Sequence, residues 1–411
     1  MWRLGNAWGA WGLYQCRCNA PGGGPKNLME TGSSFLSCDD MNSWVAMAEG
    51  ATRRKARANE RWASEKTAPA PTARRERSRV LPAGADDALV LQQNAWDNVG
   101  RTAEEQQAAE KIVRAQPVAD AARADVCRRE AAARWDEHYM ENLRNYHDRR
   151  WLLNEYPTLL RSADDAVAYR CAAGHELTIL ETGCGVGNTL LPLLTLGSRV
   201  RALGCDHSAF AVGKANERLA REELTGRGQA FIWDMGTPLP ADAPVPKGGV
   251  DTVLAIFTLS ALPPEALPRA FSHLAACLRP GGQLLFRDYG RLDLKQLKFA
   301  SNPGARLGEG HGCEWYARGD GTTAVFFTTE ALTALAAGAG LEIESAGYDR
   351  RLVVNRANQL RMHRVWVVGA LRKPGTGPAG LRWPRGTRIA LASGAVAALV
   401  LAVASVVARR R

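Results

Sequence analysis

Three acidic residues each follow a short apolar run that is typical of a buried strand. Glu181 follows LTIL, Asp206 follows VRALGC, and Asp234 follows QAFIW. The carboxyl ends of parallel strands meet at one edge of a sheet, and open α/β folds bind ligands at that edge, so we expect these carboxylates to lie together. Each acid taken singly could instead cap the helix that follows it, but that alternative explains the three together poorly.

A glycine-rich turn follows the first of these strands. The sequence ETGCGVGN supplies Gly183 and Gly185, and glycine lets the backbone turn tightly and approach a ligand with no Cβ in the way. A dinucleotide fingerprint would need glycine where the chain has Asn188, which disfavours NAD. Because Asp206 is placed to accept ribose hydroxyls and Asp234 to accept an adenine amino group, the pattern predicts an adenosine ligand without a pyrophosphate. We therefore expect S-adenosylmethionine as the cofactor.

Short apolar strands alternate with amphipathic helices from residue 176 onward. The expected strands are 177–181, 200–206, 229–234, 250–257, 283–288, 341–349 and 361–371, and the expected helices lie near 187–196, 208–222, 264–278 and 329–338. This alternation predicts an α/β fold, with a mostly parallel seven-stranded sheet covered by helices on both faces. A short link joins the last two strands, which are expected to form an antiparallel hairpin at one edge.

Composition limits the classes of partner. The 411 residues are 46% hydrophobic, enough for a full-sized core, and carry a formal net charge of +11. This charge favours polyanionic partners such as nucleic acid, or an anionic membrane surface. The nine cysteines are scattered, so they indicate a reducing compartment, and we expect no bound metal.

The chain divides into five expected segments. These are a largely disordered basic extension (1–85), a helical N-terminal extension (86–160), the main α/β domain (161–375), a Pro/Gly-rich linker (376–388) and an uncharged run (389–408). Good helix formers between 102 and 133 predict helix with a break near Pro117. The helical part leads into Trp135 and Tyr139, which share one helical face and by pattern alone are typical of packing.

The chain resembles the tRNA N3-methylcytidine methyltransferases, which are class I S-adenosylmethionine-dependent enzymes. The resemblance runs from about residue 94 to 374 in the motifs NAWDNV, DRRWLLNEYP, ETGCGVGN, IFTLSAL, LLFRDYGRLDLKQLKF, RGDGT, VFFT, DRRLVVNR and RVW. NAWDNV makes it look closest to the branch that acts on threonine tRNAs, with or without others. The resemblance implies a Rossmann-like fold with one antiparallel edge strand, methylation of cytidine 32 in the anticodon loop, and sometimes an accessory protein or an aminoacyl-tRNA synthetase as partner.

The resemblance also implies which residues contact the cofactor. Matched to this sequence, they are Trp135, Tyr139, Gly183, Asp206, Asp234, Met235 and Ile256, to which the pattern above adds Glu181 and Gly185. The helix of Trp135 and Tyr139 becomes a lid over the cofactor and part of an RNA-binding surface. Met235 stands where the family usually shows Leu, which is a volume-conserving difference.

The motif FRDYG at 286–290 ends the fifth strand, at the edge where the cofactor is expected. Arg287, Asp288 and Tyr289 should therefore face the acceptor base, with the Asp288 carboxylate stabilising the charge that develops when cytosine N3 is methylated. The expected substrate-binding residues are Arg291, Arg318, Arg350, Asn355 and Arg356. Alternatively, Arg287 and Asp288 belong to a structural ion-pair arrangement with Arg318, Arg350 or Arg351.

Two other functions and several locations stay open on the sequence alone. The fold could methylate a protein or a small molecule, or it could be a catalytically silent tRNA-binding or membrane-tethering module. The run 389–408 is long enough to span a membrane, which predicts a tail anchor in an organelle outer membrane with the enzyme on the cytoplasmic face. The N-terminus is compatible with a transit peptide, so a mitochondrial or plastid location is the alternative.

Overall fold

The computed structural model describes residues 79–142, 148–149, 151–152, 176–195, 200–300 and 302–375, all within the unit Thr67–Arg411. Most of the basic extension, the linker 376–388 and the run 389–408 lie outside the described residues, so their predicted disorder and membrane anchor stay predictions. Within the described residues, no helix has the length and apolar character needed to cross a membrane.

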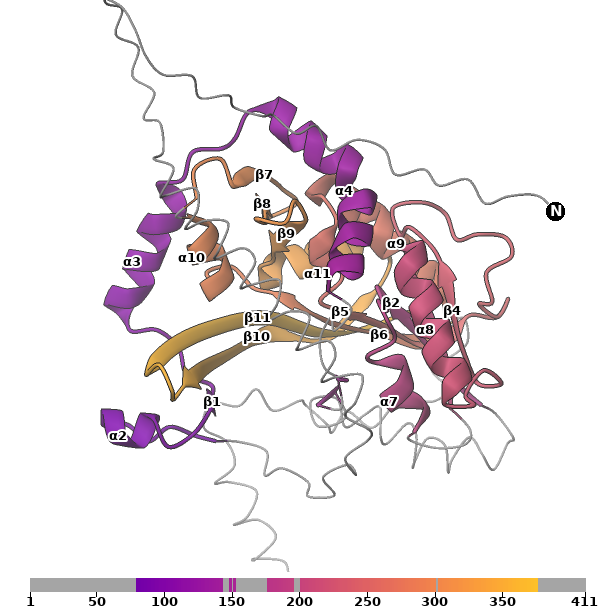
Figure 1. Ribbon diagram of the computed structural model, residues 1–411, viewed down its shortest axis with the longest axis horizontal. Coiled ribbons are helices and arrows are strands. Elements are labelled where there is room, and N and C mark those ends of the chain that lie inside the picture. Colours follow the sequence, from indigo (N-terminus) through magenta and orange to yellow (C-terminus); the bar gives the residue numbers. More distant parts are fainter. Residues whose placement is uncertain are drawn as a thin grey trace, which may run out of the picture. The chain divides into compact units, whose positions relative to one another are not determined.

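An eight-stranded sheet forms the centre of the described part (Figure 1). Its spatial order is β1-β10-β11-β6-β5-β2-β3-β4. The bounds are β1 Ala95–Asp97, β2 Leu177–Thr182, β3 Val200–Asp206, β4 Gly228–Ile232, β5 Val250–Ile256, β6 Leu278–Tyr289, β10 Glu342–Asn355 and β11 Leu360–Arg372. Strands β2 to β6 pair in parallel, whereas β11 is antiparallel to both of its neighbours.

This topology confirms the predicted α/β, Rossmann-like fold and the β10–β11 hairpin. Two details differ from the expectation. The sheet has an eighth strand, β1, which comes from the N-terminal extension and pairs antiparallel with β10. The antiparallel strand β11 lies inside the sheet, between β6 and β10, rather than at its edge. The short β1 covers the edge of β10 that the hairpin would otherwise expose.

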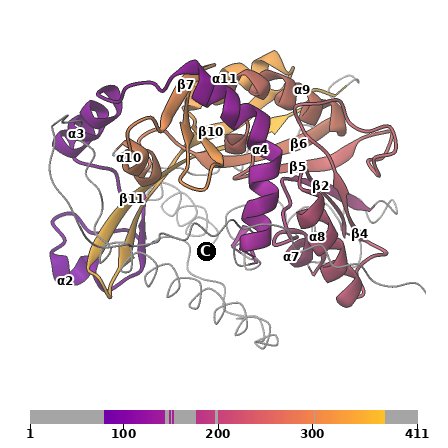
Figure 2. The same ribbon diagram turned by 45° about the horizontal axis from the view of Figure 1, so that its top comes forward.

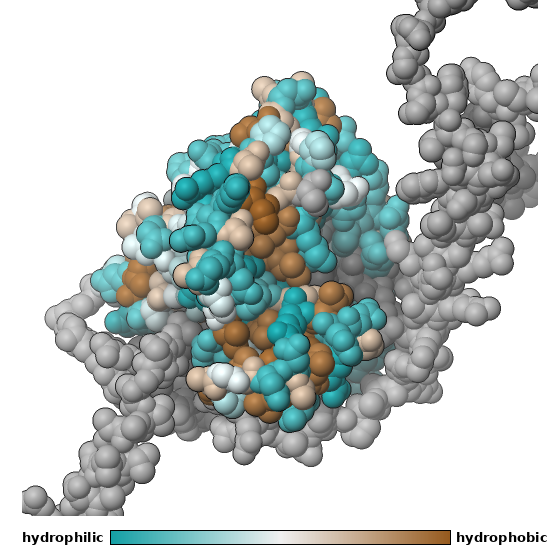
Figure 3. Space-filling view, turned by 90° about the vertical axis from the view of Figure 1, so that its left-hand side faces the viewer, coloured by the Kyte–Doolittle hydropathy of each residue, from teal (hydrophilic) through white to brown (hydrophobic). Residues whose placement is uncertain are grey.

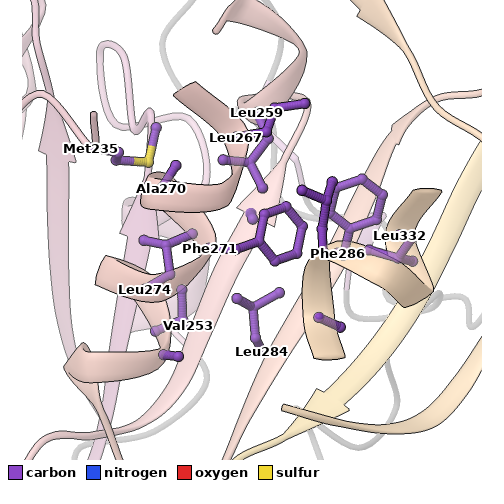
Figure 4. Packing of buried hydrophobic residues seen from close by; sticks show 14 of the residues in the cluster. Met235, Val253, Leu259, Leu267, Ala270, Phe271, Leu274, Leu284, Phe286 and Leu332 are labelled. Carbon is purple, nitrogen blue, oxygen red and sulfur yellow. The ribbon is translucent and has the colours of Figure 1, made fainter. Parts of the chain in front are cut away.

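Side chains alternate between two hydrophobic clusters on opposite faces of the sheet, as the pleat requires. In β5, Val253 packs with α9 (Leu267–Cys277) and α11 (Thr329–Gly338), while the next residue, Leu254, packs with α7 (Leu190–Leu194) and α8 (Ala209–Arg221). Figure 4 shows the first cluster, where Phe271 of α9 points toward Phe286 of β6. The central parallel strand β5 is thus buried on both faces, as expected for this class of sheet.

The segment between β6 and α11 adds elements that the periodicity did not predict. Helix α10 (Leu294–Ala300) is followed by a small antiparallel sheet of β7 (Arg306–Gly310), β8 (Cys313–Ala317) and β9 (Thr323–Phe326). Trp315 of β8 and Val325 of β9 belong to the same cluster as Phe271. The insertion is therefore part of the domain core.

The N-terminal extension contains α2 (Asp87–Val90), β1, α3 (Ala103–Arg114) and α4 (Ala121–Glu141). The predicted break around Pro117 is confirmed, since α3 ends before it and α4 begins after it. Thr102 caps α3 in a reciprocal capping box with Glu105, and the Asp120 side chain accepts a hydrogen bond from the backbone N–H of Arg123 to cap α4. In Figures 1 and 2, α4 lies near α8.

Replacing Leu274 with Ala should lower the free energy of unfolding by about 2–5 kcal/mol, because it removes a fully buried side chain from the α9 face of the core. Leu360→Ala makes the same chemical change at a side chain that is 52% exposed and should cost less than about 1 kcal/mol. Urea unfolding of both variants measures the difference. Equal destabilisation would contradict the assigned core.

Candidate functional site

The candidate site lies where the strand order reverses direction. From β2 the chain first adds β3 and β4 on one side and then returns to add β5 and β6 on the other, which makes the gap between β2 and β5 a topological switch point. Ligands of open α/β sheets bind outside the carboxyl ends of the strands at such a point. The glycine loop after β2 occupies this position.

The glycine loop adopts a backbone that only glycine accepts readily. Gly183 and Gly185 have φ values of +59° and +52°. A Cβ on Gly183 would lie 2.4 Å from a side-chain carbon of Thr258, and one on Gly185 would lie 2.9 Å from the hydroxyl of Tyr139. The loop is therefore enclosed by the loop after β5 and by α4, and Tyr139 lies at the glycine loop.

Asp206 fixes the shape of that loop. Its Oδ2 accepts the backbone N–H of Gly185 at 2.9 Å, and its Oδ1 accepts that of Ser208 at 3.0 Å. Burial raises the pKa of this carboxyl, although the two backbone donors oppose that effect. Asp206 thus lies at the strand end that the sequence predicted, with both carboxylate oxygens already accepting backbone hydrogen bonds.

Glu181 at the end of β2 is the acid with an unused acceptor. It is buried, its Oε1 lies 3.6 Å from Arg149 Nη1, and its Oε2 has no hydrogen-bond partner within the described residues. Burial raises the pKa of this carboxyl to about 7, and Arg149 limits the rise. A buried oxygen without a donor is costly unless a ligand supplies one, so Glu181 is suited to accept a hydrogen bond from a bound ligand.

The other expected cofactor residues lie along the same edge in different environments. Asp234 is exposed just beyond β4, and its Oδ1 accepts the N–H of Gly236 at 2.8 Å. Met235 is buried, and its carbonyl oxygen lies 2.8 Å from Nδ1 of His273. The Ile256 side chain is fully buried in the α7/α8 cluster. Its backbone carbonyl, at the end of β5, accepts a hydrogen bond from Arg149 Nη1 at 3.0 Å.

Helix α4 is held over this edge at both sides. Asp136, between the aromatic residues Trp135 and Tyr139, accepts a hydrogen bond from the Ser208 hydroxyl, which itself caps α8. Nδ1 of His138 lies 3.1 Å from Oδ2 of Asp320, in the turn between β8 and β9. These two contacts place α4 beside the start of α8 and the β8–β9 turn, and its role as a lid stays a prediction. Sequence reasoning did not identify Asp136, although the aromatic pair of the lid flanks it.

The residues at this edge fit an adenosine-containing cofactor. The glycine loop lets the backbone approach a ligand closely, and Glu181 has a buried acceptor oxygen without a donor in the described part of the chain. Asp206 and Asp234 follow the neighbouring strands β3 and β4, at increasing distance from the switch point. No group of three or more His, Cys, Asp or Glu side chains suited to a metal ion occurs in the described part of the chain.

The expectation that Arg287 faces the acceptor base is wrong. Arg287 is only 4% exposed, and its Nη2 lies 2.5 Å from Oδ2 of Asp349 in β10. Its guanidinium also lies 4.7 Å from the ring centre of Trp366 and 5.3 Å from that of Trp151. Arg287 therefore forms a structural ion pair, but its partner is Asp349, which was not named from the sequence. Arg351, which was named, shares the same carboxylate.

Asp288 is also buried rather than open to the substrate edge. It has no exposed surface, and its two oxygens accept the backbone N–H groups of Ser260 at 2.9 Å and Tyr289 at 2.8 Å. Burial raises the pKa of Asp288 to about 6, against these hydrogen bonds and the more distant Arg318. Asp288 therefore positions the loop after β5 and carries its charge beneath the edge of the sheet.

Aromatic rings line the edge next to Asp288. Tyr289 is half-buried, and its ring centre lies 5.4 Å from that of Phe257. Phe257 follows β5 with a positive φ of 55°, a strained conformation for a residue with a bulky side chain, and such strain is common at functional sites. The motif IFTLSAL contains Phe257, but the sequence gave no reason to single it out.

Arg318 lies at the open side of the same edge. Its guanidinium carbon is 5.7 Å from the ring centre of Trp135 and 5.8 Å from that of Tyr289. Within the described residues it forms no ion pair with a carboxylate at 4.0 Å or less. Arg318 is therefore held between the predicted lid and the FRDY motif.

The remaining expected substrate residues lie elsewhere. Arg291 and Arg350 line a pocket between α3 and the β10–β11 hairpin. Asn355 and Arg356 lie where β10 turns into β11, five or more residues beyond Arg350, which at the rise of a strand is roughly 17 Å. The five expected substrate residues are thus spread over the FRDY edge, this pocket and the end of the hairpin rather than gathered in a single site.

Stability should decrease as the pH rises through the range set by Glu181. Its pKa of about 7 in the folded state exceeds 4.5, its ordinary value, so the folded state binds the proton more tightly and loses stability between pH 4.5 and 7. Glu181→Gln should remove on the order of 2–3 kcal/mol of this decline. Urea unfolding at pH 5 and pH 8, without ligand, gives the comparison. A parallel pH dependence in the variant and the parent would contradict the assignment.

Comparison with known proteins agrees with the fold and identifies the family. A family profile described as a methyltransferase domain matches residues 55–346. The tRNA N(3)-methylcytidine methyltransferase Mettl2 of Drosophila melanogaster is 37% identical over 309 residues, which cover 72% of this chain and 91% of the relative. The tRNA N(3)-cytidine methyltransferase METTL2 of Danio rerio is 37% identical over 318 residues, with coverages of 70% and 87%.

A yeast relative adds the position of the modified base to its name. The tRNA(Thr) (cytosine(32)-N(3))-methyltransferase of Saccharomyces cerevisiae is 35% identical over 301 residues, which cover 70% of this chain and 45% of that protein. The identities, the coverage of the chain and the methyltransferase-domain match lead to one assignment. The chain belongs to the family of S-adenosylmethionine-dependent tRNA N(3)-cytidine methyltransferases.

Proposed function

We propose that this chain transfers a methyl group from S-adenosylmethionine to N3 of cytidine 32 in the anticodon loop of a tRNA, with threonine tRNAs as the first candidates. The observation that carries the proposal is the arrangement of the edge. The glycine loop and its acids lie on one side of β5, and Phe257, Tyr289 and Arg318 lie on the other. A cofactor and a planar base can therefore approach each other over the end of one strand.

The chemistry needs little acid or base catalysis. Cytosine N3 carries an in-plane lone pair, and S-adenosylmethionine supplies a methyl group on a sulfonium, so the N–C bond forms as the C–S bond breaks with its electrons moving to sulfur. The protein contributes positioning and electrostatics. The target base must leave its stack, at a cost of a few kcal/mol.

The aromatic edge is suited to hold that base. Phe257 and Tyr289 offer ring faces for stacking, and Arg318 can donate to the cytosine carbonyl O2 or to the phosphate of the same nucleotide. The ring becomes cationic as the methyl group arrives. Asp288 carries a negative charge below this edge when it is ionised, so it favours the developing charge through space while it holds the backbone of Tyr289.

A methylation assay tests the proposed function directly. Purified chain, S-adenosylmethionine and a threonine tRNA transcript should yield 3-methylcytidine, detected by mass spectrometry after nuclease digestion. A transcript with uridine in place of cytidine 32 should yield none. Methylation of both transcripts would contradict the assigned position. Cofactor binding without methylation of any tRNA, including one from cells that lack the modification, would favour another substrate or a binding module.

Asp288→Asn should slow single-turnover methylation by about ten- to a thousandfold, while cofactor affinity changes by less than about threefold. Each oxygen of Asp288 accepts one backbone N–H, and an amide cannot accept both. The parent rate should also fall as the pH drops through about 6, where Asp288 takes up a proton, and this fall should vanish in the variant.

A matched control separates this effect from general damage to the sheet. Asp251 also accepts a backbone N–H, from Thr178 at 2.8 Å, but lies at the amino-terminal end of β5. Asp251→Asn should leave the single-turnover rate and its pH profile unchanged. An Asp288 variant with the parent's rate and pH profile would show that this carboxylate does not influence the reaction.

A further inference from the structure

A polar pocket lies apart from the glycine loop. It has a volume of about 190 Å³ and is bounded by α3, the loop before α3, the loop after β6 and the facing strands β10 and β11. None of the expected cofactor residues lines it. The helix α3 and the hairpin lie at the left of Figure 1, and Figure 3 shows that the coloured surface on this side is largely hydrophilic.

Two arginines of this pocket lack a carboxylate partner. Arg101, just before α3, and Arg350, on β10, form no ion pair within the described residues. Arg350 is oriented by the ring of Tyr348, whose centre lies 4.5 Å from its guanidinium carbon. Burial lowers the pKa of Arg101, attraction to the carboxylates of Asp293 and Glu105 opposes that effect, and repulsion from Arg350 is a smaller cause. An anion between the two guanidinium groups would offset this repulsion.

The other charged residues of the pocket are already neutralised. Arg291 pairs with Glu110 at 3.2 Å, and Arg364 pairs with Asp293 at 2.8 Å. His363 adds a ring whose buried Nδ1 has no hydrogen-bond partner in the described part of the chain, and burial lowers the pKa of this imidazole. The other ring nitrogen, Nε2, lies 3.9 Å from Oε2 of Glu105. A neutral imidazole adds no third repelling charge, and in the tautomer with its single N–H on Nδ1 it can donate to an anion.

The size and the lining indicate the kind of ligand. Pockets for whole small molecules usually exceed about 300 Å³ and are mostly apolar, whereas this pocket is smaller and its lining is mainly charged and polar. Two guanidinium groups present parallel donors that match the oxygens of a phosphate. The pocket therefore fits one anionic group of a larger molecule better than a separate metabolite.

We propose that Arg101, Arg350 and His363 bind a single phosphate of the tRNA backbone, close to the target cytidine. This inference rests on the proposed function for the identity of the RNA. Arg291, which lines the pocket, is two residues beyond Tyr289, a chain separation of at most about 7 Å. A nucleotide base at Tyr289 and a phosphate in the pocket can thus belong to the same short stretch of the anticodon arm.

Binding of unmodified threonine tRNA in the presence of S-adenosylhomocysteine tests the pocket without relying on methyl transfer. Arg101→Gln and Arg350→Gln should each raise Kd about tenfold, and the double variant should be no more than about threefold weaker than either, because both side chains hold one phosphate. The slope of log Kd against log salt should fall by about one unit in all three variants. Arg350→Lys should restore most of the slope.

Arg269→Gln is the matched control, since it removes the same charge from an exposed position on α9. It should leave the tRNA Kd within about twofold, and every variant should keep the parent's cofactor affinity, which also reports correct folding. Unchanged tRNA affinity in the pocket variants, or an equal loss in Arg269→Gln, would overturn the inference. A parent chain that binds tRNA but methylates none would instead contradict the proposed function and leave the pocket result standing.

Discussion

The carboxylate of Asp206 is the contact on which the cofactor side of the molecule depends. One oxygen accepts the N–H of Gly185, and the other accepts the N–H of Ser208, where α8 begins. Ser208 in turn donates to Asp136 of α4. A single buried acid therefore links the glycine loop, the first turn of α8 and the helix that covers them.

This linkage has an electrostatic consequence for the edge of the sheet. Glu181 and Asp206 are both buried, and burial raises the pKa of each carboxyl. The charge of Asp206 adds to the rise at Glu181, and Arg149 is the cation that lies next to Glu181. A site that concentrates acids in this way disfavours pyrophosphate and favours neutral or cationic ligand groups such as ribose hydroxyls and an ammonium. The electrostatics thus agree with the absence of the dinucleotide glycine fingerprint.

The sequence was sufficient for the parallel half of the sheet because strand, turn and helix signals there are local. Val200–Asp206 was predicted with its observed bounds, and Glu181 and Asp206 were placed at strand ends. Arg287 was misplaced because its partner, Asp349, lies 62 residues away and only the pairing of β6, β11 and β10 brings them together. Non-local contacts of this kind leave no periodic signal.

The small β7–β8–β9 sheet was missed for a related reason. Its strands are four or five residues long, and two of them are joined by a turn of two residues, His311 and Gly312, with positive φ at both. Trp315 and Tyr316, neighbours in β8, are both buried, because each face of this sheet packs against other parts of the domain. That burial removes the alternation by which a strand is recognised.

The N-terminal extension is as much a part of the domain as the strands it covers. β1 pairs with β10 opposite Arg351, and Asp97 of β1 lies 3.4 Å from the Arg351 side chain, which also pairs with Asp349. The same Asp349 neutralises Arg287 beneath the FRDY motif. Removing β1 would leave β10 as an open edge and would take one carboxylate from this network, so two arginines would share one buried acid. The extension therefore supplies both the helix α4 above the substrate edge and a carboxylate, Asp97, to the ion-pair network beneath that edge.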